Sequence, residues 1–110
     1  MAKKELFTTD QQYTASFFKA LGHPARLAIM QYLAEQKVCI TGDISEELPL
    51  SRTTINQHLT ELKKVGLIQG QIEGAKVNYC LDPEKLGELK VVFNAFFSTV
   101  DLKGEVECKG

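Results

Sequence analysis

Residues 50–68 read LSRTTINQHLTELKKVGLI, and the fold can be worked out from this stretch. Ser51 is a typical cap for the first turn of a helix, and Gly66 suits the left-handed residue that ends one. These two signals predict a helix over residues 52–65. Three apolar residues within it fall on one narrow arc of a helical wheel and must face a core. They are Ile55, Leu59 and Leu62.

The opposite face of this predicted helix carries amides, hydroxyls and cations. It can be read as a merely solvated surface, but such surfaces are dominated by Glu and Lys pairs four residues apart. Asn and Gln side chains can hydrogen-bond to adenine in the major groove, Arg and Lys can bond to guanine, and threonine methyl groups contact thymine. We therefore predict a surface that reads DNA. Its predicted residues, with one lysine from a later hairpin, are Ser51, Arg52, Thr53, Asn56, Gln57, His58, Thr60, Lys63, Lys64 and Lys76.

Three of these residues have particular interpretations. Ser51, together with the helix N-terminus, suits a phosphate group. His58 borders the apolar arc, so it can either contact a base or act as a half-buried spacer against the core. Lys76 lies outside the helix, in the segment expected to reach the DNA backbone or minor groove.

Patterns on both sides of this helix complete a winged helix-turn-helix. Apolar residues recur at helical spacing in four more segments. Residues 76–81 alternate polar and apolar, and Glu73-Gly74 offers a turn, which predicts a two-stranded β-hairpin, the wing, over 69–81. The expected fold is mainly α with a small β-hairpin: five helices plus a two-stranded wing. The other four helices are expected at residues 10–21, 24–35, 41–48 and 84–100.

The first and last predicted helices are the most aromatic parts of the chain. Their apolar stripes can simply be core faces, or they can also pack against a second copy of the chain. We expect both, because the stripes are wider than one small domain needs. The predicted residues of this dimer interface are Tyr13, Phe17, Leu89, Phe93, Phe96, Phe97 and Val100.

The chain has 110 residues and a formal net charge of −1, which excludes a polybasic nucleic-acid binder. Residues 51–81 nevertheless hold four basic against two acidic side chains, so the predicted reading region is net positive. We expect one DNA-binding and dimerisation domain over 1–102 and a flexible tail over 103–110. No signal peptide or apolar run of membrane length is present, so we expect a cytoplasmic protein with no membrane partner.

An enzyme is not expected. Two histidines and three scattered cysteines form no nucleophile–base arrangement, and no glycine-rich loop could cradle a phosphate. We expect no cofactor. The expected partners are a double-stranded DNA operator and a second copy of the chain. The alternative is a winged-helix module that binds another protein and has no DNA-binding activity.

Several segments resemble the ArsR/SmtB (arsenic-repressor) family of bacterial regulators. Residues 21–29 read LGHPARLAI, residues 50–59 and 62–68 match the recognition helix, and residues 73–79 read EGAKVNY like the family's wing. The resemblance implies a homodimer built on the first and last helices. It also implies a repressor whose grip on DNA is released by a ligand, often a metal or metalloid ion.

The metal sites that this resemblance implies are incomplete. The family's thiolate site has two cysteines separated by one residue. Here Cys39 is the first of them, but the second position holds Thr41, which is a poor ligand for a soft ion. The family's zinc site needs histidines on the last helix, and residues 86–100 have none. We therefore predict no metal site. Three possibilities stay open for the cysteines: a converging metalloid site, plain packing, or a redox or persulfide switch that pairs Cys39 with Cys108. The thiol candidates are Cys39, Cys80 and Cys108.

Overall fold

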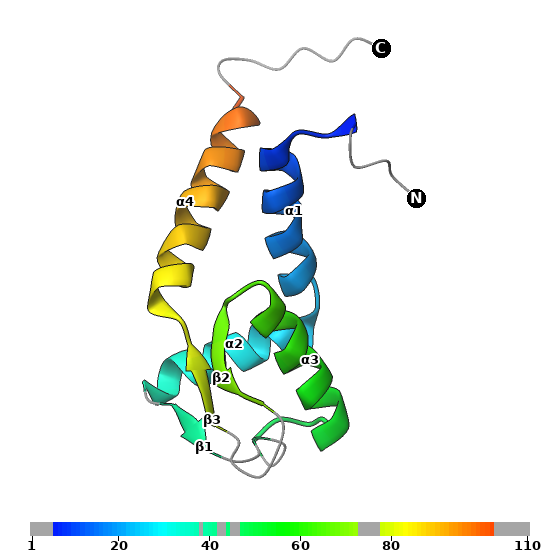
Figure 1. The fold of residues 1–110 in the computed structure, drawn as a ribbon, viewed down its shortest axis with the longest axis vertical. Coiled ribbons are helices and arrows are strands. Elements are labelled where there is room, and N and C mark those ends of the chain that lie inside the picture. Colours follow the sequence, from blue (N-terminus) through cyan, green and yellow to red (C-terminus); the bar gives the residue numbers. More distant parts are fainter. Residues whose placement is uncertain (1–5, 38, 42–43, 45–46, 73–77, 103–110) are drawn as a thin grey trace.

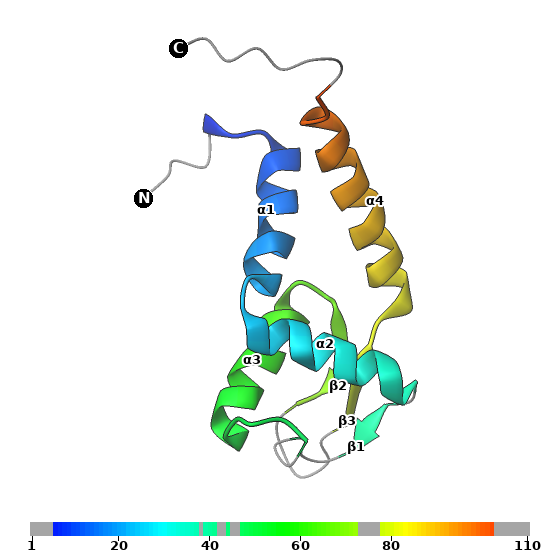
Figure 2. The same cartoon turned by 180° about the vertical axis from the view of Figure 1, so that it is seen from behind.

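The computed structural model describes residues 6–37, 39–41, 44, 47–72 and 78–102. Within this part of the chain, helices α1 and α4 run side by side away from a lower unit made of two helices and a small sheet (Figures 1 and 2). The elements are α1 (Thr9–Leu21), α2 (Pro24–Gln36), β1 (Ile40–Thr41), α3 (Arg52–Lys64), β2 (Ile68–Gln71), β3 (Asn78–Leu81) and α4 (Pro83–Thr99).

Each helix begins where a side chain accepts a backbone N–H that the helix itself cannot satisfy. Thr8 and Gln11 form a reciprocal capping box at the start of α1. His23, Ser51 and Asp82 cap the other three helices, and α2 and α4 also have proline in their first turn. Because these signals are local, the predicted starts of the four helices agree with the structure to within one residue.

The core lies where α1, α2, α3 and the sheet meet. The apolar arc predicted for α3 is confirmed, since all three of its residues are at most 1% exposed. They pack with apolar side chains from every other element of the lower unit and from α1 and α4. The buried cluster is Phe17, Ile29, Leu33, Ile44, Ile55, Leu59, Leu62, Leu67, Ile68, Ile72, Tyr79 and Leu89.

The expectation of five helices plus a two-stranded wing is wrong. The described residues form four helices and a three-stranded antiparallel sheet of order β1-β3-β2. The helix predicted at 41–48 fails because Thr41 belongs to β1, where it pairs with Asn78 of β3. β-branched residues favour such pairing. Residues 47–50 form turns, and 42–43 and 45–46 lie outside the described residues.

Strands β2 and β3 form the base of the wing. Gly70 in β2 has a φ of +115°, and a Cβ there would stand 2.1 Å from the carbonyl oxygen of Asn78 in β3. Only glycine permits this close approach of the two strands. The expected wing, 69–81, is therefore observed at its base, while its tip with Lys76 lies outside the described residues.

Candidate nucleic-acid interface

The polar face of α3 is open to solvent along its length. Arg52, Thr53, Gln57, Lys63 and Lys64 are exposed, and Asn56 and Thr60 are partly exposed. The opposite side of the same helix is buried, which fixes how the helix is rotated. The surface predicted to read DNA is thus presented outward on one helix, in the part of the chain that the structure describes.

The N-terminus of α3 is held by Ser51. Its Oγ accepts a hydrogen bond from the backbone N–H of Thr54 (3.2 Å) and donates one to the Thr54 Oγ1 (2.9 Å). Further along, the Thr60 hydroxyl donates to the carbonyl of Asn56 (2.8 Å). These bonds hold the hydroxyl groups of Ser51, Thr54 and Thr60 against α3.

The two lysines at the end of α3 are both engaged. Lys63 donates from its Nζ to the carbonyl oxygen of Gly70, which links the helix to strand β2. Lys64 forms an exposed ion pair with Glu61 at 3.0 Å, and this bond holds the pKa of the Glu61 carboxyl below its usual value. An exposed pair of this kind adds little stability. A hollow of about 470 Å³ lies between α3 and the wing and is lined by Thr60, Lys63, Lys64, Gln71 and Ile72.

His58 lies inside the protein rather than on the polar face. Its side chain is only 8% exposed, and its Nδ1 accepts a hydrogen bond from the Nε of Arg26 on α2 (3.0 Å). The ring of His23 packs against it with 4.4 Å between centroids. Burial, and then the charges of His23 and Arg26, lower the pKa of His58. Of the two roles left open for His58, this position matches the spacer.

Arg26 is a structural residue that the sequence did not single out. Besides its bond to His58, its guanidinium donates to the carbonyl of Ala20 (3.0 Å) at the end of α1. One side chain thus joins α1, α2 and α3. Arg26 lies in the stretch that resembles the family's opening motif, which is a weak signal, but spacing alone cannot reveal a contact between helices.

We expect the free energy of unfolding to decrease as the pH is lowered, because His58 takes up a proton more readily in the unfolded chain. Because its pKa is lower in the folded chain, the unfolded chain takes up a proton first as the pH drops, and this uptake favours unfolding. The stabilisation is complete above the ordinary histidine value of about 6.5 and is lost as the pH falls through the folded value. Urea unfolding at pH 7 and at pH 5 measures the loss.

The variant His58→Asn keeps an acceptor near the Nδ1 position but cannot titrate, so its free energy of unfolding is expected to fall less between the two pH values. His23→Asn is the matched control. An asparagine there can still cap α2, and the wild-type pH dependence is expected to be largely retained. Parallel pH profiles for wild type and His58→Asn would disprove the assignment.

The described cysteines pair with each other, which differs from each of the three possibilities that the sequence leaves open. Cys39 forms a disulfide with Cys80, with 4.4 Å between their Cα atoms, so the pairing of Cys39 with Cys108 is not what the structure contains. Cys39 is also exposed, which excludes it as a core-packing residue. Cys108 lies outside the described residues.

The thiolate metal site implied by the resemblance does not fit these residues. Cys39 is bonded to Cys80, and Thr41 is an exposed residue of β1. Across the residues that the structure describes, no three His, Cys, Asp or Glu side chains gather closely enough to hold a metal ion.

The residues predicted for a dimer interface separate into two groups. Phe17 and Leu89 are 1% and 7% exposed, so they belong to the core of the single chain. Phe93 is half-buried and stacks on Phe18 with 4.4 Å between ring centroids. The exposed predicted residues are Tyr13, Phe96, Phe97 and Val100, and Leu6, Phe7, Phe18, Val91 and Leu102 are also exposed.

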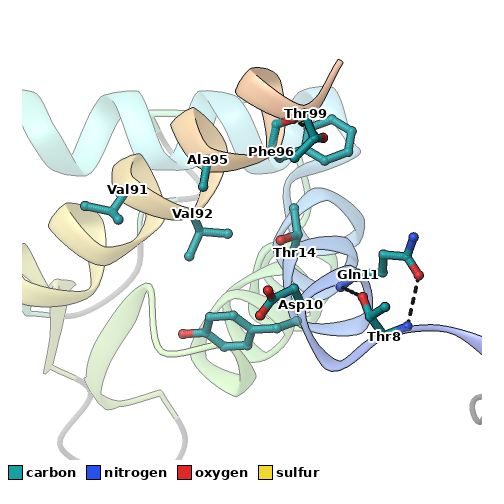
Figure 3. A pocket seen from close by; sticks show the side chains of 10 residues that line it. Thr8, Asp10, Gln11, Thr14, Val91, Val92, Ala95, Phe96 and Thr99 are labelled. Carbon is teal, nitrogen blue, oxygen red and sulfur yellow. Dashed lines mark hydrogen bonds between the residues drawn. The ribbon is translucent and has the colours of Figure 1, made fainter. Parts of the chain in front are cut away.

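Three of these exposed side chains, Tyr13, Val91 and Phe96, line a groove between α1 and α4. The groove has a volume of about 460 Å³ (Figure 3). Figure 3 shows Val92 and Ala95 of α4 on one side and Thr14 of α1 on the other. Tyr13 also lines this groove, and its hydroxyl donates a hydrogen bond to Glu88 of α4, which links the two helices and raises the pKa of the tyrosine. The described helices include none long and apolar enough to cross a membrane.

A helix with an exposed polar face beside a small β-wing is the arrangement found in winged helix-turn-helix DNA-binding proteins. Comparison with known proteins agrees with this class. The chain is 36% identical over 75 residues to an uncharacterised HTH-type transcriptional regulator of Methanocaldococcus jannaschii, which covers 68% of this chain and 84% of that protein. It is 34% identical over 89 residues to a homologue of the cadmium resistance regulatory protein CadC from Staphylococcus aureus, covering 80% and 73% of the two chains.

Residues 23–69 match the family described as bacterial regulatory proteins of the arsR family, and the chain belongs to that family. Its fold matches an ArsR-like transcriptional regulator from Rhodococcus with a TM-score of 0.66 at 22% identity, covering 84% of this chain and 87% of that one. The family's members are DNA-binding transcriptional regulators and not enzymes. The chain is accordingly a DNA-binding regulator of transcription.

Proposed function

We propose that the chain is a homodimeric repressor that reads a double-stranded operator in the cytoplasm. The recognition helix α3 enters the major groove, and the wing over 69–81 contacts the DNA backbone or minor groove. The observation that carries this proposal is the uncovered polar face of α3, opposite a fully buried apolar face. The predicted reading residues, apart from His58, supply the contacts, and Lys76 adds one from the wing.

The same observation favours DNA over a protein partner. A winged-helix module adapted to bind another protein would be expected to have this face covered by another element or to carry an apolar patch there. In the described residues the face is polar and uncovered, and it combines amides, hydroxyls and cations. These groups suit base edges and phosphates.

A second copy of the chain is the proposed occupant of the apolar face on α1 and α4. Phe97 and Val100 are more than half exposed at the end of α4, which is unusual for an isolated domain. Two-fold pairing through this face would place two recognition helices on one operator. It would also compensate for the modest positive charge of each subunit.

The repressor is expected to respond to a thiol-reactive signal rather than to a soft metal ion. The cadmium that the name of one relative mentions needs several thiolates. Here the two described cysteines are bonded to each other.

Binding to the DNA upstream of the chain's own gene tests the proposal. We expect a gel shift at nanomolar protein concentration that survives an excess of unrelated DNA, since specific affinities of this class are about 10⁻⁸–10⁻¹¹ M. Selection of bound fragments from genomic DNA with the same protein covers the case in which the operator lies elsewhere than upstream of the gene. Failure to bind any DNA fragment above the non-specific level would refute the proposal and favour the protein-binding alternative.

A further inference from the structure

The disulfide between Cys39 and Cys80 joins the residue before β1 to strand β3. Ile40 pairs with Tyr79 in the antiparallel register of β1 and β3, so Cys39 and Cys80 are the next pair along this ladder. Their Cα–Cα separation of 4.4 Å is that of directly opposed residues in an antiparallel pair. The bond therefore fastens the strand that precedes the recognition helix to the second strand of the wing, across a sequence separation of 41.

An apolar groove of about 410 Å³ borders the pair. Cys39 is exposed and Cys80 half-buried, and the Gln69 amide donates a weak hydrogen bond to the Cys80 sulfur (3.9 Å). Lys37 is the one charged side chain along the described lining, and a nearby cation favours the thiolate form of a cysteine. The apolar lining is made by Leu33, Ala34, Leu81, Pro83 and Leu86.

We propose that Cys39 and Cys80 form a reversible dithiol–disulfide site that hydroperoxides oxidise. This chemistry needs only the two sulfur atoms within bonding reach and an open path to one of them. Intracellular disulfides of this kind are usually transient and sense redox state. The site is distinct from the Cys39–Cys108 pairing that the sequence leaves open as one possibility, and its reaction does not depend on the proposed operator binding.

The reaction proceeds in two steps. The thiolate of Cys39, the more exposed of the two residues, attacks the outer oxygen of the hydroperoxide and breaks the O–O bond. Cys39 becomes a sulfenic acid, and the leaving alkoxide or hydroxide takes a proton to become an alcohol or water. The Cys80 thiolate then attacks the Cys39 sulfur, forms the disulfide and expels hydroxide, which leaves as water. Two thiols are oxidised by two electrons, and one hydroperoxide is reduced.

The state of the site is expected to affect DNA binding, a consequence that rests on the proposed function. The strand β1 has only two residues, so without the bond it is held to β3 by few backbone contacts. The disulfide restricts β1 and β3 to one arrangement and lowers the ordering cost of binding. We expect the bonded protein to bind its operator at least about fivefold more tightly than the reduced protein, within the usual range of coupled sites.

The chemical test uses the full chain, reduced and freed of reductant without oxygen. One equivalent of hydrogen peroxide, or of cumene hydroperoxide in a parallel arm, is expected to remove two of its three thiols. Non-reducing peptide mass spectrometry is expected to find the Cys39 and Cys80 peptides joined, with the loss of two hydrogens. The two arms identify whether the small or the organic hydroperoxide reacts faster at this apolar groove.

Three variants make the assignment specific. Cys39→Ser and Cys80→Ser are each expected to abolish the cross-link, whereas the matched control Cys108→Ser is expected to form it at the wild-type rate. A cross-link that contains Cys108, or thiols that survive both oxidants, would overturn the proposal. Operator affinities that are equal in the two redox states would overturn only its coupling to DNA, since the mass spectrum is independent of operator binding.

Discussion

Phe97→Asp is expected to prevent formation of the proposed dimer and, because joint binding to two half-sites is lost, to weaken operator binding by about 100-fold. Phe97 is 56% exposed in the single chain and lies beside Phe96 and Phe18 on the apolar face of α1 and α4. A carboxylate there would be buried without a partner if two copies met through this face. A protein that reads two half-sites with one dimer loses the gain from joint binding once the subunits separate.

Analytical ultracentrifugation measures the first effect, and operator titration measures the second. Phe97→Leu is the matched control, because it keeps an apolar side chain and should remain dimeric. Since the side chain is exposed, thermal unfolding of the Asp variant should still be cooperative, which separates loss of the partner from loss of the fold. A Phe97→Asp protein that sediments as a stable dimer would place the interface elsewhere.

Gln57→Ala is expected to weaken specific operator binding by about 1–3 kcal/mol, the usual value of one bidentate base contact. This corresponds to roughly a fivefold to 150-fold rise in Kd. Gln57 is exposed near the middle of α3, so its amide is free to reach a base edge and its loss leaves no cavity in the core. Competition titrations against operator and unrelated DNA should show that only the operator affinity falls.

Gln31→Ala is a matched control for this experiment. Gln31 has the same chemistry and is exposed on α2 rather than on the recognition helix, so its removal should leave the operator affinity unchanged. Equal operator affinity for Gln57→Ala and wild type would show that this glutamine does not read the sequence. An equal loss on operator and unrelated DNA would instead assign it to the phosphate backbone.

The features that could be predicted from the sequence are those set by neighbours along the chain. The bounds of α3 follow from the Ser51 cap and from Gly66, which has a φ of +85° just beyond the helix. Its rotation follows from apolar spacing, and the exposed face then follows from the rotation. These local rules account for the recognition helix and for most of the candidate DNA-reading surface.

The features that were missed depend on contacts between distant segments. Strand β1 is only two residues long and exists because β3 lies beside it, so no local pattern at Ile40 and Thr41 could define it. The bond of Cys39 to Cys80 depends on the same register. The sequence alone does not decide whether His58 lies in the interior, because the Arg26 guanidinium that bonds to it comes from another helix.

The side chain of Arg26 also links α1, which carries part of the proposed dimer face, to the recognition helix α3. It holds the last turn of α1 through the carbonyl of Ala20 and holds α3 through His58. If α1 shifts when two subunits associate, the hydrogen bonds of this guanidinium would shift the recognition helix as well. Such linkage is reciprocal, so an operator that selects one setting of α3 would also strengthen subunit association. A single arginine can in this way make dimer formation and DNA reading one cooperative event.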